Sequence, residues 1–378
     1  MRVAALLLLV GLLAVAQITS PELLFREAVA AQQRGDDALA IRKYQELLKL
    51  RPDVVEVRAN LGATLARAGR FDEAIEQYRA ALAKAGSNPA LRLNLALAYY
   101  KKNDWSGAVA QLKPLLEADP TNVRVATLLG NCYARLGQDA QVVTVLSPLV
   151  AAHRDDLAIS WELGSALIRS GHGREGLELV EHTGKSGNNA EAYLLAAKTA
   201  LQLHEFERAR DDANAALRLD AKIPGGLTLL GAVLQYLNDN QGAITALRQA
   251  LEANPNDFDA HLTLGAVLNT ERDLEGSRKH LERAVELDPA STLALYALAR
   301  MKRTQGEIEA AVKDFEQVVR KDPKWAQPHV ELAALYFRLN RQAEGERERA
   351  AFDRLNSAQT KGVNTQQAPT SPLLPPSH

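Results

Sequence analysis

Histidine is the side chain best suited to acid–base chemistry near neutral pH, and this chain carries eight of them. None forms the His-Glu-x-x-His pair that holds zinc on one helix face. The sequence also lacks the Gly-x-Ser-x-Gly nucleophile motif and a phosphate-binding glycine loop. Gly184-Lys185-Ser186 matches the end of such a loop, but the required earlier glycine is missing. We therefore expect no catalytic residue, no cofactor and no enzyme activity.

Metal binding and thiol chemistry each have one candidate. His172 and His182 could share a metal ion, although solvated loop histidines are the alternative interpretation. Cys132 is the only cysteine, so no internal disulfide can form. It lies in an apolar helical pattern, which favours a buried structural thiol over a reactive or intermolecular one. We expect no metal site.

The elements that would position any site follow from a repeat in the sequence. Two residue types show the same period of about 34 residues. Prolines preceded by Asp, Asn or Arg are separated by 68, 135, 34 and 34 residues, at Pro52, Pro120, Pro255, Pro289 and Pro323. Glycines preceded by Leu are separated by 68, 34, 67 and 34 residues, at Gly62, Gly130, Gly164, Gly231 and Gly265. One repeat near the middle of the chain is therefore 33 residues long.

Each repeat is predicted to contain two helices. In the second repeat, residues 58–67 and 71–82 carry apolar residues at spacings of three and four, with a turn at Gly69 between them. A proline then prevents the second helix from continuing. The glycines of the fifth repeat predict that its second helix is shortened. The predicted repeats begin near Pro21, Val55, Pro89, Val123, Leu157, Ala190, Pro224, Phe258, Thr292 and Ala326.

The recurring helical glycines need a steric reason, because glycine in a helix costs about 1 kcal/mol relative to alanine. Their common phase predicts a close contact between the two helices of one repeat, with large side chains filling the space beside each glycine. These predicted core residues are Tyr44, Tyr78, Leu112, Leu247, Leu281 and Phe315.

The two ends of the chain differ from the repeats. Arg2 precedes a 14-residue apolar run, Val3–Ala16, which ends in the small-x-small pattern of a signal-peptidase site. We predict a signal peptide over residues 1–16 and an exported mature chain, periplasmic or secreted, that begins at Gln17 and has no membrane span. The alternative is an uncleaved anchor, but the run reaches only about 21 Å against a hydrocarbon core of roughly 30 Å. Residues 356–378 are predicted to be a disordered, Pro-rich tail, whose Pro369–Pro376 stretch could instead be a polyproline ligand.

Charge excludes one class of partner. The chain has 45 Lys and Arg against 46 Asp and Glu. No overall positive field would attract DNA or anionic lipid. Nucleic acid is therefore not an expected partner.

The motifs of the repeats resemble those of the tetratricopeptide family. The second repeat carries Leu61-Gly62, Gly69, Ala74 and Tyr78, and the eighth carries Leu264-Gly265 and Leu281. This resemblance covers residues 21–355. It implies an all-α fold, a right-handed superhelical solenoid of antiparallel helix pairs in which first helices line the concave groove.

The resemblance also implies which residues face that groove, namely the second, fifth, ninth, twelfth and thirteenth of each repeat. The bases at these positions are Arg67, Lys101, Arg124, Arg135, Arg169, Lys198, Arg300, Arg303 and Arg338. The acids there are Glu22, Glu56, Glu191 and Asp259. Apolar members include Phe25, Tyr100, Trp161, Leu194, Tyr296 and Phe337, and several could simply pack between adjacent first helices.

Three groups of these residues are candidate sites for a partner. The first is a basic, aromatic group in the last two repeats, formed by Tyr296, Arg300, Arg303, Phe337 and Arg338. Its arginines could instead pair with Glu331 or Glu307. The second group is Tyr100, Lys101, Arg135, Trp161 and Arg169. Asn60 and Asn94 match the inner asparagine ladder of the repeats in O-linked N-acetylglucosamine transferases, but the ladder stops after two residues.

These observations predict a non-catalytic protein–protein interaction scaffold of the cell envelope. The expected ligand is an extended or helical polypeptide, acidic and partly apolar, because bases and aromatic residues alternate in the groove. The alternative is an accessory protein that handles carbohydrate in envelope polysaccharide export or assembly.

Overall fold

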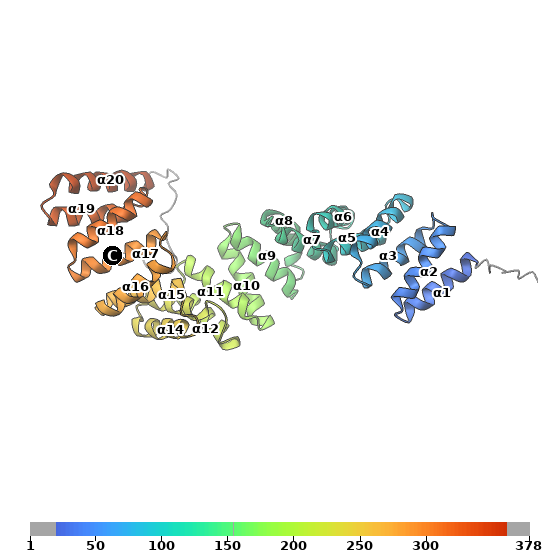
Figure 1. The fold of residues 1–378 in the computed structure, drawn as a ribbon, viewed down its shortest axis with the longest axis horizontal. Coiled ribbons are helices and arrows are strands. Elements are labelled where there is room, and N and C mark those ends of the chain that lie inside the picture. Colours follow the sequence, from blue (N-terminus) through green and yellow to red (C-terminus); the bar gives the residue numbers. More distant parts are fainter. Residues whose placement is uncertain (1–19, 154, 361–378) are drawn as a thin grey trace, which may run out of the picture. The chain divides into compact units, whose positions relative to one another are not determined.

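A computed structural model describes residues 20–153 and 155–360 of the chain (Figure 1). Within these residues the regular structure consists of twenty helices, which confirms the predicted all-α architecture. They form two compact units that divide between His153 and Arg154. The predicted signal peptide, residues 1–16, lies outside the described residues. None of the described helices is long and apolar enough to cross a membrane.

The first unit contains four helix pairs, each joined by a short turn. The helices of a pair pack against each other, and each second helix packs on the first helix of the next pair. The helices are α1 (Pro21–Gln33), α2 (Asp37–Leu50), α3 (Val55–Arg67), α4 (Phe71–Ala85), α5 (Pro89–Lys101), α6 (Trp105–Ala118), α7 (Val123–Arg135) and α8 (Asp139–Val150).

The second unit contains six pairs built in the same way. Its first helices also touch along the chain, α11 on α13, α13 on α15, and α15 on α17. The helices are α9 (Leu157–Arg169), α10 (Gly173–Gly187), α11 (Ala190–Gln202), α12 (Phe206–Leu219), α13 (Gly226–Tyr236), α14 (Asn240–Ala253), α15 (Phe258–Thr270), α16 (Leu274–Leu287), α17 (Thr292–Gln305), α18 (Ile308–Lys321), α19 (Ala326–Arg338) and α20 (Gln342–Thr360).

Local chemistry explains where first helices begin. Pro89 is the first residue of α5, and the side chain of Asn88 before it accepts a hydrogen bond from the Leu91 amide at 3.1 Å. The seventh repeat differs, because α13 begins at Gly226 rather than at the predicted Pro224. Gly225 there has a φ of 76°, a left-handed conformation that glycine adopts without strain, and this delays the helix.

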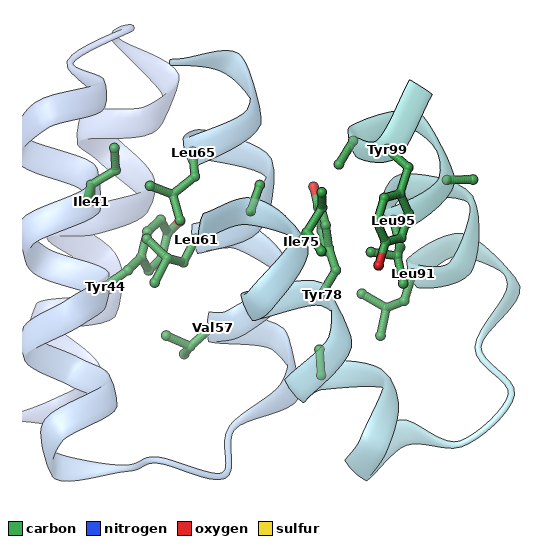
Figure 2. Packing of buried hydrophobic residues seen from close by; sticks show 14 of the residues in the cluster. Ile41, Tyr44, Val57, Leu61, Leu65, Ile75, Tyr78, Leu91, Leu95 and Tyr99 are labelled. Carbon is green, nitrogen blue, oxygen red and sulfur yellow. The ribbon is translucent and has the colours of Figure 1, made fainter. Parts of the chain in front are cut away.

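The helical glycines lie where the two helices of one repeat cross. A Cβ atom on Gly62 would lie 2.8 Å from the ring of Tyr78, and one on Gly231 would lie 2.5 Å from Cγ of Leu247. Figure 2 shows Tyr78 among the buried side chains that join α4 to its neighbours. The missing side chains therefore make room for the large core residue on the partner helix.

Two predicted boundaries are wrong. The second helix of the fifth repeat, α10, is not shortened but runs for 15 residues. Its Gly176 packs on the backbone of Gly164 in α9, so this glycine allows close approach instead of breaking the helix. Helix α20 continues to Thr360, so residues 356–360 of the predicted tail are helical. No proline or glycine interrupts residues 346–361.

Candidate partner-binding surface

Tyr296, an expected groove residue of the last two repeats, belongs to the core. It is 5% exposed, and its ring packs between Phe315 and Trp325 with centroid distances of 5.6 and 4.6 Å. Trp325 directly precedes α19, so this aromatic stack joins the ninth repeat to the tenth. Tyr296 therefore stabilises the repeat interface, which corrects its predicted place in the groove.

The arginines beside it are also engaged with the protein. Arg303 forms an ion pair with Glu331 of α19, a carboxylate that is only 7% exposed. The guanidinium of Arg300 lies 5.9 Å from the centre of the Tyr296 ring. The alternative pairing that the sequence allowed for the arginines therefore holds for Arg303. Its charge is largely neutralised within the fold.

Phe337 and Arg338 separate although they are neighbours in sequence. The Phe337 ring lies against Gly345 of α20, inside its own helix pair, so it is not a groove residue. Arg338 is exposed at the end of α19. The predicted basic, aromatic patch is thus reduced to Arg338 and the half-buried Arg300.

In the first unit, Tyr100 and Arg135 meet around a residue that the sequence did not single out, Trp105. The Tyr100 ring contacts the Trp105 ring edge-on at 5.1 Å, and its hydroxyl donates a hydrogen bond to Asn131 at 2.8 Å. The guanidinium of Arg135 lies 5.9 Å from the Trp105 ring centre. These contacts tie the third repeat to the fourth. Lys101 beside them is exposed.

The remaining predicted residues are half-buried or exposed on their own helices. Asn60 and Asn94 are half-buried on α3 and α5, and the Asn60 side chain is hydrogen-bonded to Tyr44, a contact that opposes the rise of the Tyr44 pKa caused by burial. In the second unit, Trp161 of α9 packs on the core formed with α10 and α11. Arg169 is exposed at the end of α9.

An apolar depression of about 380 Å³ lies on the first helices of the sixth and seventh repeats. Leu194 and Leu195 of α11 form one side, and Ile223 and Pro224 form the other. Two further residues of α11 complete the lining, the exposed Glu191 and Lys198.

The late start of α13 explains why the depression is there. Other repeats carry a buried side chain at their third position, as Val57 and Leu91 do. The seventh repeat has Gly226 there, and a Cβ atom on it would lie 2.7 Å from Cγ2 of Ile223. Ile223 therefore occupies the space that this side chain fills elsewhere. The turn that places it leaves the wall opposite α11 open.

Electrostatics extend this surface to α15. Asp259 is exposed, yet desolvation by surrounding protein raises the pKa of its carboxyl, and the charge of Lys198 opposes that rise. The two observations differ because exposure measures contact with water, whereas desolvation depends on how many protein atoms lie nearby. An exposed carboxylate with many protein neighbours lies on the wall of a hollow. Lys198 and Asp259 therefore belong to one concave surface over α11, α13 and α15.

The described residues show no group of three His, Cys, Asp or Glu that could hold a metal ion. His172 and His182 each lie beside a serine of their own segment, Ser170 at 3.4 Å and Ser186 at 3.5 Å. Cys132 is fully buried, and burial raises the pKa of its thiol to about 11. A neutral thiol of this kind is not a ready nucleophile, as the bland interpretation of the sequence expected.

Comparison with known families agrees with this geometry. Three family models, each described as tetratricopeptide repeat, match residues 25–89, 65–129, 102–167, 228–292 and 293–324. The chain is a tetratricopeptide-repeat protein. No curated protein sequence matches it.

Solved tetratricopeptide-repeat structures are similar in fold. A chain of the APC/C hetero-tetramer Cut9–Hcn1 is 14% identical with a TM-score of 0.51, over 92% of this chain and 90% of that one. MamA from Desulfovibrio magneticus RS-1 is 23% identical with a TM-score of 0.39, over 47% of this chain and 97% of its own. YrrB, a repeat protein with an unusual peptide-binding site, is 20% identical with a TM-score of 0.40, over 48% and 94%. These identities show the fold alone.

Within the tetratricopeptide register, Glu191, Leu194 and Lys198 are the second, fifth and ninth residues of the sixth repeat. They are among the positions that the sequence assigned to the groove, and the structure brings them together at the depression. The sequence analysis missed Ile223 and Pro224, which precede a first helix. The adjacent pair Gly225-Gly226 was the available signal, because it departs from the pattern of the other repeats.

Proposed function

We propose that this tetratricopeptide-repeat protein is a non-catalytic scaffold that holds a polypeptide segment over α11, α13 and α15. The observation that carries the proposal is the apolar depression lined by Leu194, Leu195, Ile223 and Pro224, with charged side chains around it. A concave apolar site with a few polar groups at its edge is the usual form of a ligand site.

The depression supplies a modest share of the binding energy. Burying one side chain the size of leucine stabilises a complex by about 1.5–3 kcal/mol, which corresponds to roughly ten- to a hundredfold in affinity. Binding of a longer segment therefore adds contacts along neighbouring first helices. A repeat surface suits this mode, because each first helix presents one more set of side chains to the same segment.

The test begins with peptides selected from a random library on the full-length mature chain. Their affinity for the parent is compared with that for Leu194→Glu, which places a carboxylate in the depression. Leu219→Glu is the matched control, because Leu219 is 44% exposed at the end of α12 and outside the depression. We expect at least a tenfold loss for Leu194→Glu and no change for the control.

Melting curves keep this test interpretable, since Leu194 also contacts the core of α10 to α13. Leu194→Ala, a milder change, should show an intermediate loss with a melting curve close to that of the parent. Undiminished binding by both Leu194 variants would exclude the depression as the site.

We further propose that the scaffold acts in the cell envelope. The support is the sequence of residues 1–16, which has the charge, apolar run and cleavage pattern of a signal peptide. Expression of the whole chain in a Gram-negative host should yield periplasmic protein that begins at Gln17. Recovery of membrane-bound protein with Met1 intact would contradict the proposal. Offering oligosaccharides to the same purified protein tests the carbohydrate alternative.

A further inference from the structure

The charges around the depression are arranged unlike most others on the first helices. Arg67 pairs with Asp37, and Arg303 pairs with Glu331, so these bases are occupied by the fold. In the described part of the chain, Lys198 takes part in no ion pair. The surface over α11, α13 and α15 therefore presents charge that a ligand can neutralise.

The two acids near the depression are in the same condition. Neither Glu191 nor Asp259 forms an ion pair within residues 20–153 and 155–360. Asp259 is exposed on a wall that desolvates it, and desolvation favours a cationic neighbour because the carboxylate has lost part of its hydration. Lys198 acts on Asp259 at a distance without contacting it, so both groups keep their full hydrogen-bonding capacity. The surface thus combines a basic group on α11 with a desolvated acidic group on α15.

We propose, on the basis of the function proposed above, that Lys198 and Asp259 determine which polypeptide binds. The preferred segment places an apolar side chain in the depression, a carboxylate at Lys198 and a cationic side chain at Asp259. This partner is zwitterionic, in contrast to the acidic partner predicted from the sequence. Opposite charges at the two ends of the site also fix the register of the segment.

The spacing between the two charged side chains of the segment follows from the fold. Packed helix axes lie about 10 Å apart, and an extended chain advances about 3.3 Å per residue. The path from α11 towards α15 crosses between one and two helix spacings. The carboxylate and the cation of the segment are therefore about three to six residues apart.

Three labelled peptides of equal length test this specificity. The first, Ser-Asp-Leu-Ser-Gly-Ser-Lys-Ser, is zwitterionic, and the others carry Asp or Lys at both charged positions. Affinities for the full-length mature chain are measured by fluorescence anisotropy at low ionic strength, where exposed charges are least screened. We expect the parent to bind the zwitterionic peptide about three- to tenfold more tightly than the other two, as a pair of partly exposed contacts allows.

Charge reversal of the protein gives the decisive comparison, because it predicts gains as well as losses. Asp259→Lys should switch the preference to the acidic peptide, and Lys198→Asp should switch it to the basic peptide. A misfolded variant cannot produce such a switch. Reversal of Arg338, an exposed base outside this surface, should leave the order of the three affinities unchanged.

The outcomes separate the inference from the proposed function. Equal binding of all three peptides, or no switch in the variants, would overturn the assignment of Lys198 and Asp259 and leave the depression as an apolar site. If no peptide binds at all, and library-selected peptides are unaffected by Leu194→Glu, the proposed function fails with it. A change in oligomeric state on charge reversal, measured by analytical ultracentrifugation, would identify a second copy of the chain as the occupant and overturn the peptide proposal.

Discussion

Asp212 of α12 is a buried carboxyl that should make the protein less stable as pH rises. It is 8% exposed and lies beside Glu181 of α10. Glu181 is held as a carboxylate by Arg208, whose Nη2 donates to it at 2.6 Å. Arg208 also donates to Glu178 at 2.9 Å and to Glu205 at 3.0 Å, so three carboxylates already share its charge. The chain therefore keeps Asp212 protonated near neutral pH.

The magnitude follows from the pKa of Asp212. Desolvation, together with the charge of Glu181 and its hydrogen bond, raises this pKa from 3.8 to about 8. Both the folded and the unfolded state hold the proton below pH 4. Between pH 4 and 8 the unfolded state has lost the proton and the folded state has not, so stability falls as pH rises. At about 1.4 kcal/mol per pH unit, the loss over this window is of the order of 4 kcal/mol.

The assay compares the parent with Asp212→Asn in chemical denaturation between pH 4 and 9. Asparagine keeps the shape and can donate to Glu181, but it does not titrate. The variant should become more stable than the parent as pH rises, and the gain should level off above pH 8. The difference between the two proteins isolates Asp212 from other titrating groups. A constant difference across the whole range would refute the reasoning.

Three further changes test the packing and the charges. Gly231→Leu should destabilise the protein by about 1–3 kcal/mol in denaturant titrations, because even a Cβ atom there lies 2.5 Å from the facing leucine of α14. An unchanged unfolding midpoint would contradict the assigned helix contact. Arg303→Glu sets a carboxylate against the buried Glu331 and should cost about 2–4 kcal/mol, whereas Arg338→Glu at an exposed position should change stability by less than about 0.5 kcal/mol. Equal melting of these two variants would show that the ion pair does not stabilise the fold. Burial lowers the pKa of His280 to about 4, so its contribution to stability is present above pH 6.5 and is lost as pH falls towards 4. His280→Gln should flatten this part of the stability profile, and an identical profile would count against a neutral buried histidine.

The helix pairs were predictable because their signals are local. Proline at the start of α5 and an asparagine cap before it act within one turn, and these effects need no distant partner. The contact between Gly231 and Leu247 was also predictable, because a common helical phase recurs in every repeat and makes each repeat evidence for the others. The shortened α10 was a false prediction, because a glycine gives the same local signal whether it breaks a helix or allows close packing.

The candidate site was less predictable, because its residues depend on partners far away in sequence. The repeat register assigned Arg303 and Lys198 to the same groove. Only the tertiary structure shows that Arg303 is neutralised by Glu331, 28 residues later, whereas Lys198 is exposed beside an apolar depression. The sequence by itself determined the period, the helices and the small-to-large contacts within each repeat, since these follow from steric rules over a few residues. The tertiary structure decided which charges stay available to a partner, because desolvation and ion pairing depend on what the neighbouring repeats place around each side chain.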